Sequence, residues 1–381
     1  NCAQLVNHLA FAFDNLPGVS ALDNLGLPES GDGKGDVLQL AKWEADYLLR
    51  MQDLDGGFSF LTYPRDAKYE WNVLPDKGYP QVIWPKNTSA TACATAALAQ
   101  MASSPRFKQQ FPVEATAYLA AAQRGWSFLK TAWARHGRPG SYQAVTHYGR
   151  DFADLDEIVW CETEMYLATG DPAIHTLLLQ DLDPANPAAV KWNWWRLFES
   201  YGGAIRSYAF AVSSGRQPAS KLDTTFLGKC QQQIRLAGQD ALAWTNGSAY
   251  GISYSFPDKR SYNAAWYSAL MYAFDMAVAN ALAPDPLYLD GIVSNLNYEL
   301  GGNPNNVSFL TGMGWLRQRE MVSQYGANDR RRLPPSGIPI GALSAVLPAL
   351  GLYTTELRNL SYPADSKTPL GFGLYDRWTD T

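Results

Sequence analysis

The chain has 381 residues, of which 46% are hydrophobic and 18% charged. This composition excludes a disordered protein, because the chain can bury a sizeable core. The net charge of −5 argues against a nucleic-acid or anionic-membrane partner, which would require a basic surface. No apolar run approaches the roughly 18 to 20 residues needed to span a bilayer. Aromatic residues reach 13%, which favours a surface that stacks on sugars or bases, although cores also use such rings.

At both ends, the sequence has the pattern that we expect of a segment from a longer polypeptide. The first residues, from Asn1 to Phe13, already follow an apolar helical rhythm without a cap, and no signal-peptide pattern precedes them. The chain closes on Trp378-Thr379-Asp380-Thr381, with no helix to finish on. We find no internal linker, so we expect residues 1–381 to form a single domain that is trimmed at both ends.

Apolar residues recur at three- and four-residue steps along most of the chain, which is the spacing of helices. After the opening stretch, the expected helices in chain order are 37–52, 88–101, 111–134, 154–169, 189–213, 222–237, 263–282, 286–300 and 343–357. Asp36 is a plausible N-cap, Pro112 suits a first turn, and Gly170-Asp171-Pro172 is a strong stop signal. No stretch shows sustained strand alternation.

The connections between these helices alternate in character. Those at 168–172 and 283–286 are short, whereas those at 56–87, 136–153, 244–262 and 301–341 are long and rich in Gly, Pro and aromatic residues. Helix pairs with short links on one side and long loops on the other describe an all-α toroid, whose long loops build a site on one face.

Carboxylates are the first candidates for chemistry. Asp154, Asp156 and Glu157 open a helix, where the dipole favours acids, and a hard-cation site with loop carbonyls is the alternative. Glu162 and Glu164 fall within an otherwise apolar helix, so they lie either on an ordinary exposed face or toward a toroid cavity. Both choices stay open.

Common catalytic motifs are absent from the sequence. There is no G-x-S-x-G, no phosphate-binding loop and no H-E-x-x-H, and the four histidines are scattered. The four cysteines are far apart, and we expect buried free thiols. The triple arginine Arg330, Arg331 and Arg332 is either a solvated charge run or a ligand contact. Because it stands among Gly/Pro turns and aromatics, we favour ligand contact, where arginine forks donate paired hydrogen bonds.

Four segments resemble the catalytic module of family 9 glycoside hydrolases, the endoglucanase family with an (α/α)6 barrel. They are LPESGDG at 27–33, WEADYLLRMQ at 43–52 with DGG after it, DEIVW at 156–160 with YLATGD after it, and LGGNP at 300–304 followed by SFLTG. The resemblance covers essentially the whole chain, and it implies an (α/α)6 toroid with long loops on one face.

The resemblance also implies roles for particular residues. The family's HxR substrate motif falls near Asp329 to Arg332, without its histidine, and Phe256 and Arg260 match a W-x-x-x-R pair that contacts sugar. Asp156 and Glu157 match positions that help bind a structural Ca²⁺ in some members, and no other cofactor is required. With Trp84 and Trp315, which lie in long loops or at their exits, these residues are expected to line a sugar-binding groove.

The catalytic residues themselves are expected outside the chain. In the family, the base comes from a DAGD motif just ahead of the first helix, and the acid is a glutamate several residues beyond the position of Asp380. Asp380 is expected to support that acid. An inverting glycosidase needs both carboxylates, one on each side of the scissile bond.

The sequence is therefore interpreted as a glycoside hydrolase that acts on a β-1,4-linked glucan with inversion. An exo-acting glucosaminidase on chitosan oligomers and a non-catalytic glycan-binding toroid are the alternatives. The expected partner is a β-linked polysaccharide or oligosaccharide, with no nucleic acid and no membrane, and the protein is expected to be a secreted or periplasmic monomer.

Overall fold

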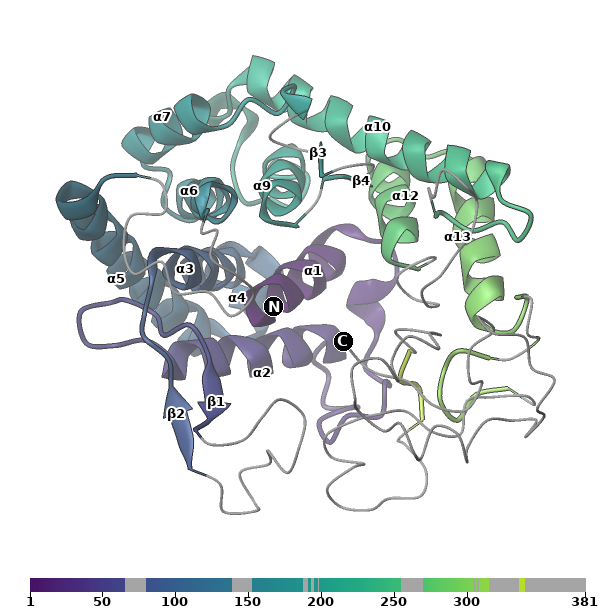
Figure 1. Ribbon diagram of the computed structural model, residues 1–381, viewed down its shortest axis with the longest axis horizontal. Helices are drawn as coiled ribbons and strands as arrows, with labels where there is room; N and C mark the ends of the chain where they lie inside the picture. The colour runs from purple at the N-terminus through teal and green to yellow at the C-terminus, as the bar shows by residue number, and fades with distance from the viewer. Residues whose placement is uncertain are drawn as a thin grey trace. The chain divides into compact units, whose positions relative to one another are not determined.

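The computed structural model describes residues 1–65, 80–138, 153–187, 191–192, 195–197, 199–254, 270–303, 306, 308–314 and 336–339. The chain divides into two compact units (Figure 1). Unit 1 comprises Asn1–Tyr63 and Ile83–Leu236, and unit 2 comprises Pro64–Val82 and Ala237–Thr381. Each unit is described by itself, and the expectation of one domain over residues 1–381 stays a prediction.

Unit 1 is built from helices. They are α1 (Cys2–Asn15), α2 (Asp36–Arg50), α3 (Thr88–Ser103), α4 (Pro105–Gln110), α5 (Pro112–His136), α6 (Leu155–Thr169), α7 (Pro172–Asp181), α9 (Glu199–Ala209) and the first part of α10 (Thr224–Gly247). Short strands occur in the loops. β3 (Lys191–Trp192) pairs with β4 (Trp195–Arg196) inside unit 1, and β1 (Thr62–Pro64) pairs with β2 (Gln81–Ile83), two strands that cross the boundary of the unit. Two 3-10 turns, η1 (Val19–Ala21) and η3 (Ala219–Lys221), complete it.

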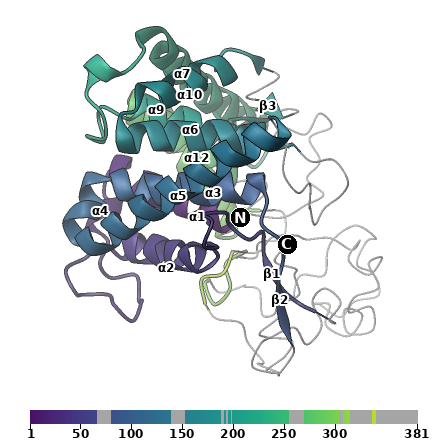
Figure 2. The same cartoon turned by 90° about the vertical axis from the view of Figure 1, so that its left-hand side faces the viewer.

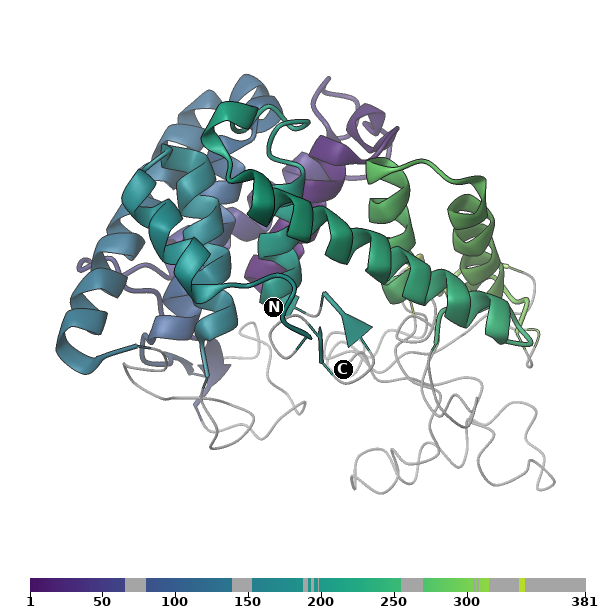
Figure 3. The ribbon, with the colours of Figure 1, turned by 90° about the horizontal axis from the view of Figure 1, so that it is seen from above.

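The helices of unit 1 pack in pairs, with one inner and one outer member. The inner helices α1, α3, α6 and α9 pack against one another, while α2 packs on α1, α5 on α3 and α7 on α6. Seen from above, the blue and teal helices lie side by side (Figure 3). Burial follows this order, because α3 and α6 are buried nearly all round and α2 and α7 along one face only.

Small residues explain the central position of α3. Its sequence is rich in Ala and Thr, so neighbouring helices can approach closely. Gly125 of α5 lies where an added Cβ would stand 2.1 Å from the Thr95 hydroxyl oxygen, a contact that only glycine avoids. Asn7 of α1 and Gln100 of α3 join their helices through an amide hydrogen bond of 2.8 Å inside the core.

The inner helices α1, α3 and α6 begin at the end of unit 1 where the N-terminus lies, and α4 lies at the opposite end (Figure 2). The long connections from α2 to α3 and from α5 to α6 therefore both lead to the N-terminal end. We call this end, at which Thr88 and Leu155 start their helices, the inner-helix face. Within unit 1 it is the face on which the sequence places the site.

In unit 2, α12 (Leu270–Leu282) and α13 (Pro286–Glu299) form a helical hairpin, joined by a turn in which Asp285 caps α13. The buried Asn295 of α13 accepts a hydrogen bond from the Ser253 backbone nitrogen at 2.8 Å and donates one to the Gly291 carbonyl at 2.8 Å. This amide ties the loop after α10 to α13.

The expected helices are confirmed with changes in their limits. Among the described residues of the stretch 189–213, the α-helix is α9, which β3 and β4 precede, and α7 was not expected. The helix expected at 343–357 lies outside the described residues. None of the described helices has the length and apolar character needed to cross a membrane.

Candidate active-site face

The first turn of α6 brings acidic side chains to the inner-helix face. Asp154 is the N-cap residue of α6, and Asp156 and Glu157 occupy its first turn. The buried Asp154 carboxylate accepts a short hydrogen bond from the Thr88 hydroxyl, and Glu157 accepts one from the Ser89 hydroxyl at 3.2 Å. The starts of α3 and α6 are therefore held together by hydroxyl–carboxylate bonds.

Two neighbouring acidic side chains lie in this turn. Burial raises the pKa of Glu157, and the neighbouring Asp156 carboxyl raises it further. The second carboxylate oxygen of Glu157, Oε2, is buried without a hydrogen-bond partner. On α9, burial raises the pKa of Tyr201 to about 12, and the charges of Asp156 and Glu157 add to this shift. The first turns of α6 and α9 thus share one acidic environment.

Oxygen ligands of this kind suit a hard cation. Two carboxylates and the Ser89 hydroxyl match the donors that Ca²⁺ prefers, and the unpartnered Glu157 oxygen has capacity for a metal. Ca²⁺ takes about 6 to 8 oxygens. In the described part of the chain, no group of three or more His, Cys, Asp or Glu side chains could hold a metal ion. Asp156, Glu157 and Ser89 therefore fit as part of a coordination shell.

Trp84 reaches the same face from the connection between α2 and α3. Its backbone nitrogen donates to the Leu61 carbonyl at 2.8 Å, and its half-buried ring lies 6.3 Å from the ring of Phe60. Two positions on, Lys86 binds the carboxylates of Asp53 and Asp55 at 2.6 and 2.7 Å. These contacts fix the segment just before α3, so Trp84 sits on a restrained backbone.

Glu162 and Glu164 have neither of the environments considered from the sequence. Both side chains are fully buried. Glu162 pairs with Arg138 at 2.6 Å, and Arg138 also pairs with Asp181. Burial, followed by the charge of Asp181, raises the pKa of Glu162 to about 8. The expectation of an exposed face is wrong, because basic side chains from other segments bury these acids as ion pairs.

Glu164 is embedded more deeply. It pairs with Arg216 and accepts hydrogen bonds from Ser207 and, at 3.2 Å, from the Trp160 indole nitrogen. Arg216 is itself 4% exposed and donates to the Ser103 hydroxyl at 2.8 Å. This cluster links α6, α9 and α3 and acts as a structural element of the core.

Unit 2 holds one acid that sequence analysis missed. Glu299 is buried, neither of its carboxylate oxygens has a hydrogen-bond partner, and burial raises its pKa to about 8. Its backbone carbonyl accepts a hydrogen bond from Phe309 at 2.7 Å. No sequence signal marks it, because an acid between Tyr298 and Leu300 in a helix end is normally solvated.

The remaining predicted binding residues lie outside the described residues. These are Phe256, Arg260, Trp315, Arg330, Arg331, Arg332 and Asp380. Trp84, Asp156 and Glu157 are the predicted site residues that the structure describes, and it brings all three to the inner-helix face.

The sequence model of glycosyl hydrolase family 9 matches residues 7–345. This chain belongs to glycosyl hydrolase family 9. Endoglucanase C of Cellulomonas fimi is 26% identical over 328 residues, which cover 83% of this chain and 28% of that protein. The cellulose 1,4-beta-cellobiosidase of Acetivibrio thermocellus is 23% identical over 316 residues, covering 76% of this chain and 34% of that protein.

Solved structures of family 9 show the fold. A metagenome-derived family 9 endoglucanase superimposes with a TM-score of 0.71 at 24% identity, over 89% of this chain and 59% of that one. The structure of AaCel9A in complex with cellobiose-like isofagomine gives a TM-score of 0.69 at 19% identity, over 89% of this chain and 62% of that one. The expected all-α (α/α)6 fold class is confirmed. The family 9 chain spans about a third of the length of the curated relatives named above.

Proposed function

We propose that this chain is the barrel region of a glycoside hydrolase that cleaves β-1,4-linked glucans. The family 9 match over residues 7–345 carries the proposal. Relatives named endoglucanase C and cellulose 1,4-beta-cellobiosidase support a glucan as the substrate class, and the second name specifies a 1,4-beta linkage. A polymeric substrate does not enter cells, which supports a secreted or periplasmic location.

The inner-helix face is the proposed binding face. The long connections and Trp84 gather there, and an aromatic ring on a restrained backbone offers a flat apolar surface to the face of a sugar ring. Arg260, Trp315 and Arg331 lie outside the described residues and stay predicted sugar contacts. Hydroxyl groups of the glucan would accept hydrogen bonds from the arginines.

Hydrolysis with inversion needs a base carboxylate that activates water and a protonated carboxyl that assists the leaving group, about 6.5 to 9.5 Å apart. The family resemblance assigns both to positions beyond residues 1 and 381, and this remains a prediction. Glu162 and Glu164 are poor candidates, because both side chains are fully buried beside Arg138 and Arg216 and are closed to a polymer.

We also propose that Asp156 and Glu157 hold a structural Ca²⁺, with the Ser89 hydroxyl beside them. The support is the pair of adjacent carboxylates with one buried, unpartnered oxygen. A bound cation would neutralise this charge and fix the starts of α3 and α6 relative to each other, so it would organise the binding face without entering the reaction.

The direct test is an activity assay on a soluble β-1,4-glucan and on chitosan oligomers, with reducing ends counted and the anomer of the first product read by NMR. The chain of 381 residues is assayed beside one extended at both termini. We expect the extended protein to hydrolyse the glucan with inversion. Cleavage of chitosan alone would support the glucosaminidase, and glucan binding without cleavage in both proteins would support a non-catalytic toroid.

A further inference from the structure

A cavity lies in unit 1, away from the inner-helix face. It has a volume of about 730 Å³, within the range of roughly 300 to 1,000 Å³ typical of small-molecule sites. Its walls come from the loop before α2, the first three turns of α2 and the junction of α4 with α5. Because α4 lies at the end of unit 1 opposite the N-terminus (Figure 2), this α2–α5 pocket is separate from the inner-helix face.

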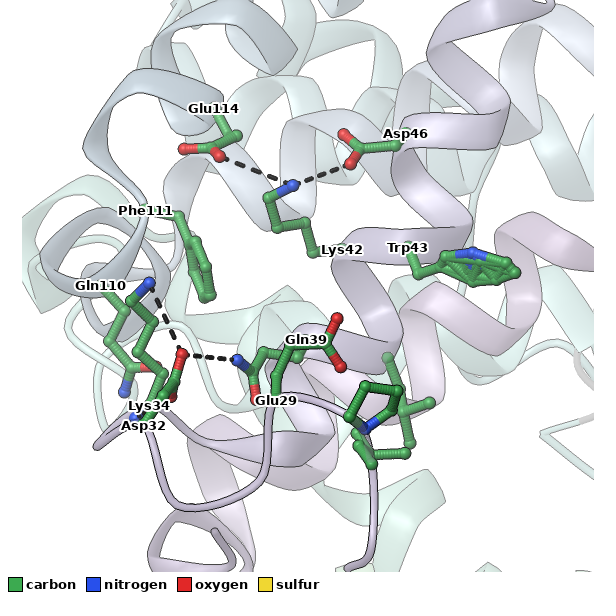
Figure 4. Close-up of a pocket in the computed structure, with 13 residues that line it drawn as sticks. Glu29, Asp32, Lys34, Gln39, Lys42, Trp43, Asp46, Gln110, Phe111 and Glu114 are labelled. Carbon is green, nitrogen blue, oxygen red and sulfur yellow. Dashed lines mark hydrogen bonds and ion pairs between the residues drawn. The ribbon is translucent and has the colours of Figure 1, made fainter.

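The polar groups that line the α2–α5 pocket are held in place (Figure 4). Lys42 lies between the carboxylates of Asp46 at 2.8 Å and Glu114 at 3.5 Å. The Gln39 side chain donates to Asp32 at 3.0 Å, while its own amide oxygen is buried without a partner. Fixed groups with spare hydrogen-bonding capacity are the usual feature of a binding pocket.

The pocket also has an exposed aromatic rim. Trp43 is 65% exposed and stands at the edge of the pocket in Figure 4. Leu40 precedes it by three residues and Tyr47 follows by four, and both are exposed, so an apolar stripe runs along this face of α2. Inside, the Phe111 ring is buried and lies 5.0 Å from the Lys34 ammonium group.

The charged side chains that line the α2–α5 pocket indicate which class of ligand it can bind. The lining contains four carboxylates, Glu29, Asp32, Asp46 and Glu114, and two ammonium groups, Lys34 and Lys42. The surplus of negative charge disfavours phosphates and other anions. Three of the carboxylates already accept from lysine or glutamine side chains, so the charge left for a cationic ligand is small. A neutral ligand with many hydroxyl groups fits both the donors and the acceptors.

We propose that the α2–α5 pocket is a second oligosaccharide site, which holds a neutral β-glucan chain while another part of the polymer occupies the inner-helix face. The polar lining would bind hydroxyl groups, and the ring of Trp43 would stack on the next sugar. The choice of a glucan rests on the proposed function, whereas the pocket and its rim do not.

The test uses cellopentaose titrated into the full chain by calorimetry, together with hydrogen exchange over α2 and the start of α5. Trp43→Ala is compared with Val113→Ala, since Val113 is 78% exposed on the first turn of α5 and does not line the pocket. We expect cellopentaose to protect both segments from exchange. Trp43→Ala should lower the affinity of the pocket for cellopentaose at least fivefold, whereas Val113→Ala should change that affinity by less than twofold. Neither exposed position should change the thermal midpoint.

Two results would overturn the proposal. One is equal cellopentaose binding by the two variants without protection of α2. The other is binding of a glucosamine pentamer alone, abolished by Glu29→Gln, which would make the pocket cation-selective. Glucan hydrolysis is measured separately, on the protein extended at both termini. No hydrolysis by the extended protein while cellopentaose still binds at the α2–α5 pocket would contradict the proposed function only. Normal hydrolysis by the extended protein without binding of cellopentaose at the pocket would contradict this inference only.

Discussion

The buried acids in the first turn of α6 and those in its middle differ in their charged partners. In the middle, Glu162 and Glu164 each have an arginine within ion-pair distance. In the first turn, Glu157 is raised in pKa by burial and by Asp156, and one of its oxygens has no partner. Glu157 and Glu162 each have a raised pKa and one oxygen without a hydrogen-bond partner, so the neighbouring arginines are what distinguish the middle of α6 from its first turn.

This difference separates structural acids from candidate functional acids. A buried charge with a dedicated partner stabilises the fold only in combination with that partner. A buried carboxyl that lacks one must bind a proton, a cation or a ligand. The comparison therefore directs attention to the start of α6, and removing or adding charge at either place tests it.

The largest effect should follow loss of the partner of Glu164. Arg216→Met leaves a fully buried carboxylate unpaired, and we expect the free energy of unfolding to fall by about 3 to 5 kcal/mol. Urea denaturation measures it. The double variant Arg216→Met/Glu164→Gln should recover much of the loss, and an equal loss in the double variant would show that packing of the arginine, not charge, is responsible.

Glu299 tests the same principle with pH. Its pKa is raised from 4.5 to about 8 in the folded chain, so the folded state binds the proton more tightly than the unfolded state. Stability should therefore fall as pH rises between these values, by about 1.4 kcal/mol for each pH unit. Denaturation at pH of about 5 and about 7 should differ by up to roughly 3 kcal/mol, and the difference should shrink in Glu299→Gln. An unchanged slope in this variant would contradict burial of a protonated acid.

Calcium should stabilise the first turn of α6. At a Ca²⁺ concentration about 100 times its dissociation constant, a single site adds about 2.7 kcal/mol to the free energy of unfolding, which differential scanning fluorimetry detects as a higher thermal midpoint. Glu157→Gln should abolish the shift, whereas Glu162→Gln, in the same helix, should retain it. A calcium shift that survives Glu157→Gln would place the ion elsewhere.

The smallest expected effect concerns the proposed groove. Trp84→Ala removes a half-buried ring beside Phe60, and we expect an affinity loss for cellopentaose of about 1 to 3 kcal/mol, measured by calorimetry. Leu54→Ala, at a side chain that is 99% exposed in the same connection, is the matched control and should bind normally. Equal affinities of the two variants for cellopentaose would show that Trp84 is not part of the groove.

Local signals in the sequence predicted much of the fold. Pro286 starts α13 as expected, with Asp285 as its N-cap, and Gly170 ends α6 in a left-handed conformation with a φ of 70°. Helix α7 was not predicted, because the same Gly-Asp-Pro sequence also starts it. Asp171 is the N-cap of α7, and Pro172 is its first residue. These three residues therefore contain both the stop signal of α6 and the start signal of α7.

The candidate site was harder to predict than the helices, because it depends on contacts between residues that are far apart in the sequence. Asp156 and Glu157 follow from the family motif, but the burial that raises the pKa of Glu157 depends on packing against other helices. Arg138 and Arg216 stand 24 and 52 residues from the acids they pair with, and no pattern in α6 announces them. The α2–α5 pocket likewise joins segments that are distant in sequence.

Hydrogen exchange with and without cellopentaose tests the central claim most directly, namely that the glucan binds at the inner-helix face. The account predicts protection of the segment from Trp84 to Ser89 and of the first turn of α6, with no change in the middle of α6 around Glu164. Protection confined to other segments, with both of these unchanged at saturating cellopentaose, would contradict it.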